Sequence, residues 1–550
     1  IDNQLFAAPR EISSNNPTYR QARASPEWEH WQKACDDEIS NLRRLGTIDE
    51  NDAIPEDTLP SWNPAKGSAR EVVNILWVLR VKYVDGVFDK FKARAVVDGR
   101  DQKKKNPLME TFSPACRSTT HKLIVAEGCL LGYQKRTWDV EAAYLKGKLP
   151  EGQPIYARPP LGYRSFINGV PLVWRLNTPL YGEADAGRLW YKTIITFLLE
   201  QRVFAQSKYD PCLFWKQFSD GSRMYIVLYV DDGFSIDNGS KEADNELDAI
   251  NAQFKITIKN EATFFLGNNV TCHSESKVTL SSRAYIERTV DKYLPKPIED
   301  YSVHDTPSDA SLMLAYEHAL SEKRKGNSAD VTLKEAYASK VGALIYVVPV
   351  CRVDCAFTIG ILARCLTFPT AEMNEAANRC LAFLARHPDD GLTYNASSRP
   401  RDLHAYSDSN WSVGHSTSGW VVMYCGAAIG YGSKRQQSIA LSSTEAEIMA
   451  ASMAATEILY FRGIMSELGH DLEATVLYVD NQGAVELSKD AKSCQRSRHI
   501  ERRYLRIREL VAQGDIAVKY VNTEDNHADL LTKPLERVVF QKHSRALFGA

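Results

Sequence analysis

The sequence lacks the features of a membrane or secreted protein. No apolar run approaches the roughly 20 residues that span a bilayer, and the longest candidates, 72–79 and 225–230, have the length of strands. No signal-peptide pattern stands at the N-terminus. The 11 cysteines include no C-x-x-C pair, which favours a reducing compartment. We therefore expect an intracellular protein with no membrane partner.

An excess of charge of either sign is also missing. With 67 Lys and Arg against 69 Asp and Glu, the formal charge is −2, so no global basic field attracts nucleic acid and local grooves would have to do so. The apolar (44%) and charged (25%) fractions are those of ordinary globular proteins. A length of 550 residues predicts roughly three or four domains.

Changes in residue pattern divide the chain. Residues 1–25 form a polar lead-in, and a helix is predicted from Pro26 to near Gly46. Residues 337–386 have helical spacing of apolar residues. Beyond residue 401 the pattern predicts an α/β unit with strands at 403–406, 419–425, 428–433, 474–479 and 516–521 and helices at 443–468, 482–489 and 500–512.

The sharpest motif is Tyr229-Val230-Asp231-Asp232. It follows the apolar run 224–228 and precedes Gly233 and a second apolar run, which predicts two strands joined by an acidic turn. Such a hairpin would place adjacent carboxylates in a cleft. Taken alone, the pair is better explained as a plain surface turn.

A second acid changes that interpretation. Asp139 stands at the end of a predicted short strand, with Tyr144 five residues later. Phosphoryl transfer to a nucleotide needs two divalent ions about 3.5–4 Å apart, and Mg²⁺ takes only one or two protein carboxylates. An acid on one strand and a pair on a neighbouring hairpin would supply these ligands. Asp139 alone could equally be a helix N-cap, so the prediction depends on both motifs together.

Residues 401–550 carry a further acidic set at the ends of predicted elements. Asp408 follows the first strand, Glu447 lies in the first turns of the long helix, Asp480 follows the strand at 474–479, and Asp529 starts a short helix. Four acids at neighbouring element ends would form a two-metal hydrolytic site, although each alone could be a cap or turn residue.

Two glutamates compete for the helical position. Glu445 and Glu447 lie about 200° apart at roughly 100° per residue, so one of them is expected to face solvent. We predict that Glu447 is the ligand.

The motifs in order resemble those of copia-type LTR retrotransposon Pol polyproteins, in their reverse transcriptase and ribonuclease H portion. The resemblance runs from about Pro26 to the end and includes Leu180-Tyr181-Gly182 and Phe265-Leu266-Gly267. It implies a multidomain α+β and α/β fold. A right-hand polymerase would place its fingers and palm at 26–270 and its helical thumb and connection at 271–400, followed by a ribonuclease H-like domain at 401–550.

The resemblance also implies roles for residues. Asp139 and Asp231 would hold both polymerase metals, with Asp232 more peripheral. The nuclease metals would be held by Asp408, Glu447, Asp480 and Asp529. Tyr144 would be a steric gate against the ribose 2′-OH, with core packing as the alternative.

Nucleotide contacts follow from the same resemblance. Arg94 would meet the triphosphate, because a guanidinium contacts phosphate oxygens bidentately, and Lys82 is a weaker candidate. A solvated strand charge is the alternative for both. Tyr229 and Arg188 are further candidate substrate contacts. Asp185 departs from the family's usual glutamine, and an acid there would be repelled by a triphosphate unless it turns away.

The densest basic segment lies between the third and fourth nuclease acids. His499, Arg502 and Arg503 are predicted to grip phosphates of an RNA–DNA hybrid, a contact that weakens steeply with salt. The alternative is a solvated helix face paired with acidic neighbours. His527 would either assist product release or cap its helix.

The chain also lacks the Asp-Thr/Ser-Gly of a retroelement protease, the His/Cys cluster of an integrase and a phosphate-binding loop, which predicts a processed polyprotein product. We expect an RNA- and DNA-templated DNA polymerase that also cleaves RNA in hybrids. Alternatives are a non-catalytic nucleic-acid scaffold and a host nuclease whose polymerase half is only structural.

The predicted cofactors and partners follow. Each site would use two Mg²⁺, with Mn²⁺ as a substitute. The substrates would be an RNA template, a DNA primer, RNA–DNA hybrid and deoxynucleoside triphosphates. Integrase and capsid proteins of the same element are candidate partners, and a homodimer stays open. The expected location is cytoplasmic virus-like particles, with later transport into the nucleus.

Overall fold

The computed structural model places two compact units. Unit 1 comprises Ile1–Ala115, Asp139–Phe204 and Glu246–Thr257, and unit 2 comprises Cys116–Trp138, Ala205–Asn245 and Ile258–Ala550. The predicted domain boundaries at residues 25, 270 and 400 stay predictions. The structure describes residues 14–59, 72–84, 87–100, 102, 107–150, 152, 154–398, 402–411, 415–489 and 501–549.

Unit 1 is built on a sheet with the strand order β1-β7-β5-β2-β3. Its strands are β1 (Ile54–Pro55), β2 (Val73–Val84), β3 (Val87–Val97), β5 (Ile155–Arg158) and β7 (Val170–Leu176), with β6 (Phe166–Ile167) paired to β7. Helix α2 (Trp28–Arg44) packs against β3, because Trp31, Cys35, Ile39 and Leu42 form one buried stripe. The helix predicted from Pro26 to near Gly46 is thereby confirmed.

Unit 1 also holds short helical elements that carry candidate site residues. The 3₁₀ helix η5 (Ala143–Lys146) contains Tyr144, and α5 (Ala186–Thr196) follows Asp185. Phe254 of α6 (Lys241–Phe254) packs edge-on against Trp190 of α5.

In unit 2, a first sheet carries the acidic hairpin. Its strands run in the order β12-β4-β11-β10-β9-β8, and β12 spans Ile256–Lys259. Their bounds are β4 (Gln134–Val140), β8 (Ala205–Gln206), β9 (Leu213–Gln217), β10 (Arg223–Tyr229) and β11 (Asp232–Asp237). Helix α4 (Ser118–Leu131) is buried from Thr120 to Cys129, and its buried residues include the polar side chains of His121, Lys122 and Glu127.

A second sheet and a set of helices follow. The sheet order is β13-β14-β15-β16, with bounds β13 (Phe264–Phe265), β14 (Asn268–Ser274), β15 (Lys277–Ser281) and β16 (Leu392–Asn395). The helices are α7 (Arg283–Tyr293), α8 (Ala310–Arg324), α9 (Val331–Val350), α10 (Ala356–Arg364) and α11 (Ala371–Arg386). The region predicted to be helical therefore also contains strands, of which β15 and β16 pair across more than a hundred residues of chain.

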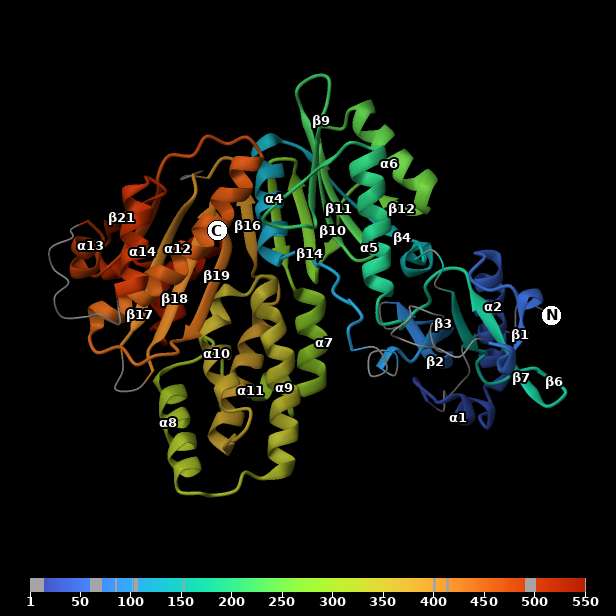
Figure 1. Ribbon diagram of the computed structural model, residues 1–550. Helices are drawn as coiled ribbons and strands as arrows, with labels where there is room; N and C mark the ends of the chain where they lie inside the picture. Colours follow the sequence, from blue (N-terminus) through green and yellow to red (C-terminus); the bar gives the residue numbers. More distant parts are fainter. Residues whose placement is uncertain are drawn as a thin grey trace. The chain divides into compact units, whose positions relative to one another are not determined.

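The C-terminal sheet has the order β19-β18-β17-β20-β21 (Figure 1, orange to red). Strand β17 (His404–Asn410) pairs antiparallel with β18 (Thr417–Tyr424) and parallel with β20 (Thr475–Val479). The other elements are β19 (Ala427–Arg435), α12 (Ser443–Glu467), α13 (Gln482–Lys489), α14 (Glu501–Ala512), β21 (Ile516–Tyr520) and α15 (Arg537–Phe548). The predicted multidomain fold of mixed α+β and α/β type is confirmed.

Helix α12 is the one helix in the described ranges that is long and apolar enough to cross a membrane. Its length and composition alone give weak support for a span, because 56% of its most apolar window is buried inside the protein. The helix packs on β17 and β18 as a core element.

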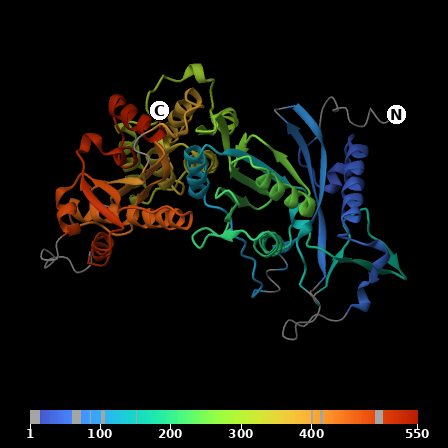
Figure 2. The ribbon, with the colours of Figure 1, turned by 90° about the horizontal axis from the view of Figure 1, so that it is seen from above.

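Within unit 2, the C-terminal sheet contacts α4 directly (Figures 1 and 2). Glu127 of α4 accepts hydrogen bonds from the Tyr424 hydroxyl and the His470 imidazole, both at 2.9 Å. Asp210 accepts from the Thr120 hydroxyl at 2.5 Å and the Tyr460 hydroxyl at 3.3 Å. Glu127 and Asp210 are 3% and 1% exposed, so these bonds satisfy carboxylates that burial would otherwise penalise.

Candidate active sites

The acidic hairpin forms as predicted. Tyr229 of β10 pairs with Asp232 of β11, which leaves Val230 and Asp231 as a two-residue turn. Val230 has a φ of 60°, a left-handed conformation that a β-branched residue rarely adopts. Strain of this kind persists where the surroundings enforce it and is concentrated at functional sites. The turn leaves Asp231 and Asp232 exposed.

The strand β4 carries the third predicted polymerase acid. Trp138 is buried, whereas Asp139, the next residue, is exposed. A Cβ at Gly233 would lie 2.1 Å from the Trp138 indole, so only glycine fits beside that ring. Trp138, which precedes Asp139, is therefore in contact with Gly233, which follows Asp232.

The Phe265-Leu266-Gly267 segment forms a hairpin between β13 and β14. Leu266 and Gly267 both have positive φ, at 50° and 78°. A Cβ at Gly267 would lie 2.3 Å from the Tyr346 hydroxyl of α9, so a larger residue does not fit there.

In unit 1 the predicted nucleotide contacts meet around one aromatic residue. The Arg94 guanidinium lies 5.3 Å from the Tyr181 ring centroid, and the Tyr144 ring meets Tyr181 edge-on at 6.1 Å. Gly187 of α5 faces Tyr144 with room for an ordinary contact. Next to this group, a cavity of about 550 Å³ is lined by the end of β3 and the turn at Gly182. Arg94 and Tyr144 thus share one neighbourhood.

The other predicted nucleotide contacts are engaged with the protein itself. Lys82 forms an ion pair with Asp89 at 3.5 Å, which agrees with a solvated strand charge. Arg188 is paired with Glu110. Asp185 is 4% exposed, so the acid that replaces the family's usual glutamine is withdrawn from solvent.

The nuclease acids come together more closely. Ligand oxygens of Asp408, Glu447 and Asp480 all lie within 4.8 Å of one another. Asp408 does not follow the end of a strand, as the sequence suggested, but lies inside β17 opposite Gly419. The strand continues to Asn410 because its residues 407–409 are buried between neighbours.

Burial and the charges of neighbouring acids raise the pKa values of the Glu447 and Asp480 carboxyl groups. The pKa of Glu447 lies well above its usual range because of burial and then the charges of Asp408 and Asp480. Burial and Asp408 also raise the pKa of Asp480. Glu447 Oε1 accepts from the Ser409 backbone at 3.1 Å, whereas its Oε2 is buried without a hydrogen-bond partner. Crowded carboxylates with an unsatisfied buried oxygen are the chemistry that a divalent cation would complete.

Asp529 stands beside this trio. It is 4% exposed, and burial, followed by the charge of Asp408, raises its pKa to about 7. Lys533 forms an ion pair with its carboxylate at 2.8 Å, and Thr532 donates a hydrogen bond to Asp408. Sequence reasoning missed Lys533 and Thr532, although Lys533 lies one helical turn beyond the acid.

One expectation about the long helix is wrong. Glu445 does not face solvent but is 5% exposed. Its carboxylate accepts from the Leu441 backbone N–H at 2.6 Å, while Ser442 caps the Glu445 N–H at 3.1 Å. These capping bonds explain why Glu445 is buried, and Glu447 is the glutamate that lies with Asp408 and Asp480.

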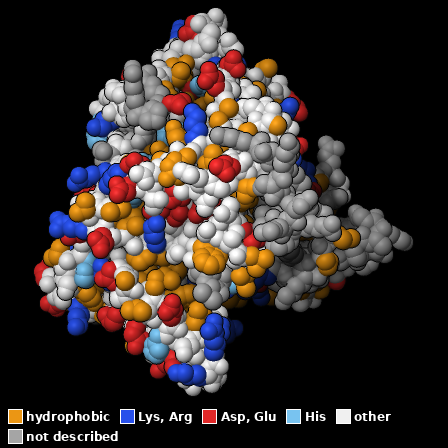
Figure 3. Space-filling model, turned by 90° about the vertical axis from the view of Figure 1, so that its left-hand side faces the viewer, with side chains coloured by type: hydrophobic (Ala, Val, Ile, Leu, Met, Phe, Trp, Pro, Cys, Tyr) orange, Lys and Arg blue, Asp and Glu red, His pale blue; other side chains and the backbone are white. Residues whose placement is uncertain are grey.

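The capping role suggested for His527 belongs to Asn526, whose side chain accepts from the Ala528 N–H at 3.1 Å. His527 instead contacts His543, with their Nδ1 atoms 2.9 Å apart. His499 and the side chains of Arg502 and Arg503 lie outside the described residues. Figure 3 shows Lys and Arg interspersed with Asp and Glu on one face, with no broad basic field among the described residues there.

Sequence reasoning also missed Tyr181 as a site residue. Its motif, Leu180-Tyr181-Gly182, was noted, but the ring's position between Arg94 and Tyr144 depends on tertiary packing. The Tyr181 carbonyl accepts from the Val97 N–H at 2.7 Å, which fixes the turn at the end of β3.

Comparisons with known proteins define the class, because they identify a reverse transcriptase domain in this chain. Residues 64–298 match the family described as reverse transcriptase (RNA-dependent DNA polymerase). The chain is 30% identical over 529 residues to a retrovirus-related Pol polyprotein from transposon TNT 1-94 of Nicotiana tabacum, covering 95% of this chain and 38% of that protein. It is 29% identical over 555 residues to the Pol polyprotein from transposon RE2 of Arabidopsis thaliana, covering 99% and 36%.

A solved structure of the foamy viral protease-reverse transcriptase in complex with dsDNA is 14% identical, covering 94% of this chain and 86% of that one, with a TM-score of 0.47. The chain belongs to the copia-type retrotransposon Pol family, as its motifs predicted. It spans between 36% and 38% of the length of the two plant relatives.

Proposed function

We propose that this chain copies RNA and then DNA templates into DNA, and that its C-terminal site hydrolyses the RNA of RNA–DNA hybrids. One observation carries the two-activity proposal. The close trio of Asp408, Glu447 and Asp480 lies outside residues 64–298, which alone match the reverse transcriptase family. A polymerase without a second activity would have no need of this second buried carboxylate cluster.

In the polymerase step, the primer 3′-OH attacks the α-phosphate of a deoxynucleotide in line with the leaving pyrophosphate. Asp139 and Asp231 would hold two Mg²⁺, which supply charge stabilisation and lower the pKa of the attacking hydroxyl. Asp232 is assigned a peripheral role. Arg94 binds phosphate oxygens of the incoming nucleotide, and Tyr144 occupies the space that a 2′-OH would need.

In the nuclease step, Asp408, Glu447 and Asp480 would hold two Mg²⁺, with Mn²⁺ as a substitute, and the ions supply an activated water. Asp529, beside this trio, completes the set. Lys533 holds the Asp529 carboxylate in place. Hydrolysis of the RNA strand frees the first DNA strand to serve as the next template.

The biological setting is part of the proposal. The substrates are template RNA, primer DNA, hybrid duplex and deoxynucleoside triphosphates. Integrase and capsid proteins of the same element are proposed partners in cytoplasmic virus-like particles, with later transport of the product into the nucleus. Measuring the molecular mass of the protein in solution, with and without an RNA–DNA hybrid duplex, tests whether two copies of the chain act together.

Primer extension on poly(rA) with oligo(dT) and Mg²⁺ tests the polymerase function. The wild-type chain is expected to incorporate dTTP, and Asp231→Asn is expected to lose incorporation. Equal incorporation by both proteins would contradict the assignment and favour a non-catalytic scaffold. Hybrid cleavage without any extension would instead favour a nuclease whose polymerase half is structural.

A further inference from the structure

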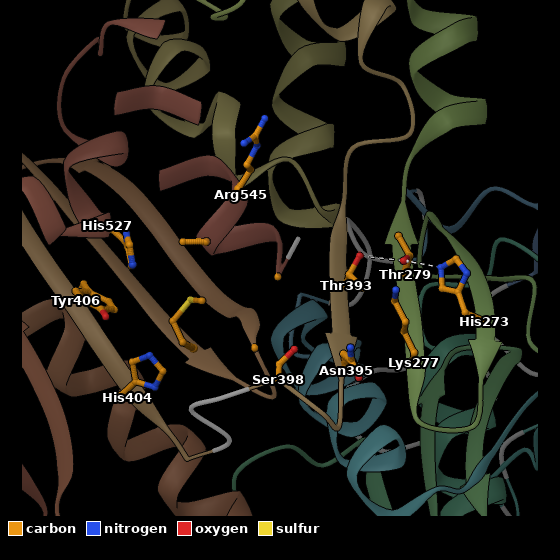
Figure 4. A pocket seen from close by; sticks show the side chains of 14 residues that line it. His273, Lys277, Thr279, Thr393, Asn395, Ser398, His404, Tyr406, His527 and Arg545 are labelled. Atoms are coloured by element: carbon orange, nitrogen blue, oxygen red, sulfur yellow. Dashed lines mark hydrogen bonds between the residues drawn. The ribbon is translucent and has the colours of Figure 1, made fainter. Parts of the chain in front are cut away.

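A cavity of about 730 Å³ lies in unit 2 outside both candidate active sites (Figure 4). One wall comes from the β14–β16 sheet, with His273, Lys277 and Thr393. The other comes from the C-terminal sheet and its neighbours, with Tyr406 and Arg545. The proposed catalysis assigns no role to this space.

The charged side chains among the described lining residues are basic, and one acid, Asp402, lies near the wall at His404. Lys277 on β15 and Arg545 on α15 are exposed and come from different walls, and none of the described residues that line the cavity is acidic. Asp525, the acid whose charge reaches His527, is already paired with Lys542 at 2.7 Å. The cavity therefore offers two fixed cations to an anion.

Hydroxyl and imidazole groups add ordered hydrogen-bonding capacity. His273 Nε2 lies 2.9 Å from Thr279 Oγ1, which lies 2.9 Å from Thr393 Oγ1 (Figure 4, dashed lines). On the facing wall, His404 and His527 point toward the cavity. Since these groups are already held by neighbours, they would bind a ligand with little loss of conformational freedom.

The walls themselves are tightly fixed. A Cβ at Gly426, in the β18–β19 turn, would lie 2.5 Å from Ser398, and one at Gly549, after α15, would lie 2.3 Å from the Thr393 carbonyl. Both glycines have positive φ, so larger residues are doubly excluded. The cavity is thus a built feature of the packing between β16 and the C-terminal sheet.

An aromatic surface completes the lining. The Tyr406 ring stacks on Tyr478 with centroids 5.0 Å apart and planes at 24°, and the His527 ring lies against it at 4.8 Å and 59°. Aromatic side chains bind nucleic-acid bases without sequence preference. Guanidinium and ammonium groups are the usual protein partners of phosphate.

We propose that this cavity binds a nucleotide unit through its phosphate, between Lys277 and Arg545, with the base against Tyr406. The unit is either a free nucleotide or the phosphorylated end of a strand. This third site goes beyond the proposed catalysis and does not depend on it. Tyr406 and Asp408 alternate on β17, so the cavity shares a strand and a sheet face with the nuclease acids.

Calorimetric titration of the full chain in EDTA tests the proposal, because the metal-free catalytic carboxylates repel phosphates. The titrants are dTMP, pyrophosphate, thymidine and a dT hexamer with or without a 5′-phosphate. The double variant Lys277→Gln, Arg545→Gln is expected to weaken dTMP and pyrophosphate binding by at least about tenfold. The matched control Arg324→Gln, Lys334→Gln changes the same charges on exposed helix positions away from the cavity and is expected to bind as wild type.

Each outcome bears on the proposal. Tyr406→Leu should weaken dTMP and leave pyrophosphate unchanged, and thymidine should not bind. Tighter binding of the phosphorylated hexamer than of dTMP identifies a strand end, and equal binding identifies a free nucleotide. Equal affinities in the cavity and control variants, at unchanged melting temperature, would overturn the proposal, as would the absence of saturable binding by wild type.

Discussion

The carboxyl groups of the proposed polymerase site and those of the proposed nuclease site lie in opposite surroundings. Asp139, Asp231 and Asp232 are exposed at strand and turn ends. The nuclease acids Asp408 and Glu447 are 5% and 6% exposed and crowd one another. An exposed acid contributes little to folding until substrate arrives, whereas a buried cluster destabilises the metal-free fold. Five predictions test this difference.

The largest expected effect is a complete separation of activities. Asp231→Asn should lower primer extension by about 10³-fold or more and leave hybrid cleavage intact, and Glu447→Gln should do the reverse. The measurements are dTTP incorporation and cleavage of a labelled RNA–DNA hybrid by the same preparations. Glu445→Gln is the matched control, since this residue caps α12. If one substitution abolished both reactions, the two clusters would not be independent.

Gly233→Ala should destabilise the hairpin by about 3 kcal/mol, because the new Cβ would lie 2.1 Å from the Trp138 indole. Extension should fall while hybrid cleavage persists. Gly342→Ala in α9 is the control, since no atom lies within 4 Å of its added Cβ. That change should stabilise by about 0.5–1 kcal/mol, as in an exposed helix interior. Wild-type thermal stability in Gly233→Ala would disprove the tight contact.

Neutralising a buried acid should stabilise the metal-free protein. Glu447→Gln keeps an oxygen to accept from Ser409 and removes a charge from the crowded trio, so we expect a gain of about 1–2 kcal/mol in EDTA. Asp231→Asn should leave stability unchanged. Added Mg²⁺ should stabilise wild type more than Glu447→Gln. Urea unfolding with and without Mg²⁺ measures all three, and a loss of stability in Glu447→Gln would argue against repulsion.

The pH dependence of stability should carry the sign of a raised carboxyl pKa. Asp529 has a folded pKa of about 7 against 3.8 for the ordinary group, so the folded state holds the extra proton between these values. Metal-free stability should therefore fall as pH rises from about 4 to about 7, by less than about 1.4 kcal/mol per pH unit for one proton. Asp529→Asn should flatten this slope in urea unfolding series. An unchanged slope would show that a group other than Asp529 holds the extra proton of the folded state.

The smallest effect is expected at Lys82. Its exposed ion pair with Asp89 contributes at most about 1 kcal/mol, so Lys82→Gln should alter the KM for dTTP less than about twofold. Arg94→Gln should raise that KM by about tenfold without lowering the melting temperature, since Arg94 is exposed. Steady-state extension kinetics distinguish them. A larger effect at Lys82 than at Arg94 would reverse the assignment.

The sequence predicted those parts of the fold that depend on local pattern. The Tyr229–Asp232 hairpin, the long helix at 443–468 and the nuclease strands all formed, because alternation and turn residues determine them locally. The strand β16 was not identified, since it is short and its partner β15 lies more than a hundred residues earlier in the chain.

Site residues could be predicted where an acid stands at the end of a helix or strand. They were harder to predict where tertiary packing determines the position of the side chain. Glu445 was assigned to solvent from helical angle alone, but a capping interaction with Leu441 buries it. Tyr181 and Lys533 act through neighbours that the sequence does not place. The Lys277–Arg545 cavity joins residues from β15 and α15, far apart in the chain, and no local motif indicates it.

The hydrogen bonds of Glu127 and Asp210 have a practical consequence. Their partners Tyr424, His470 and Tyr460 all belong to the C-terminal region. In a polymerase fragment truncated near residue 400, Glu127 would lose its two donors, Tyr424 and His470. The side of α4 that the C-terminal region covers would then be open to water. Expression of the separated halves should accordingly yield a poorly soluble fragment, so purification and crystallisation are best attempted with the undivided chain.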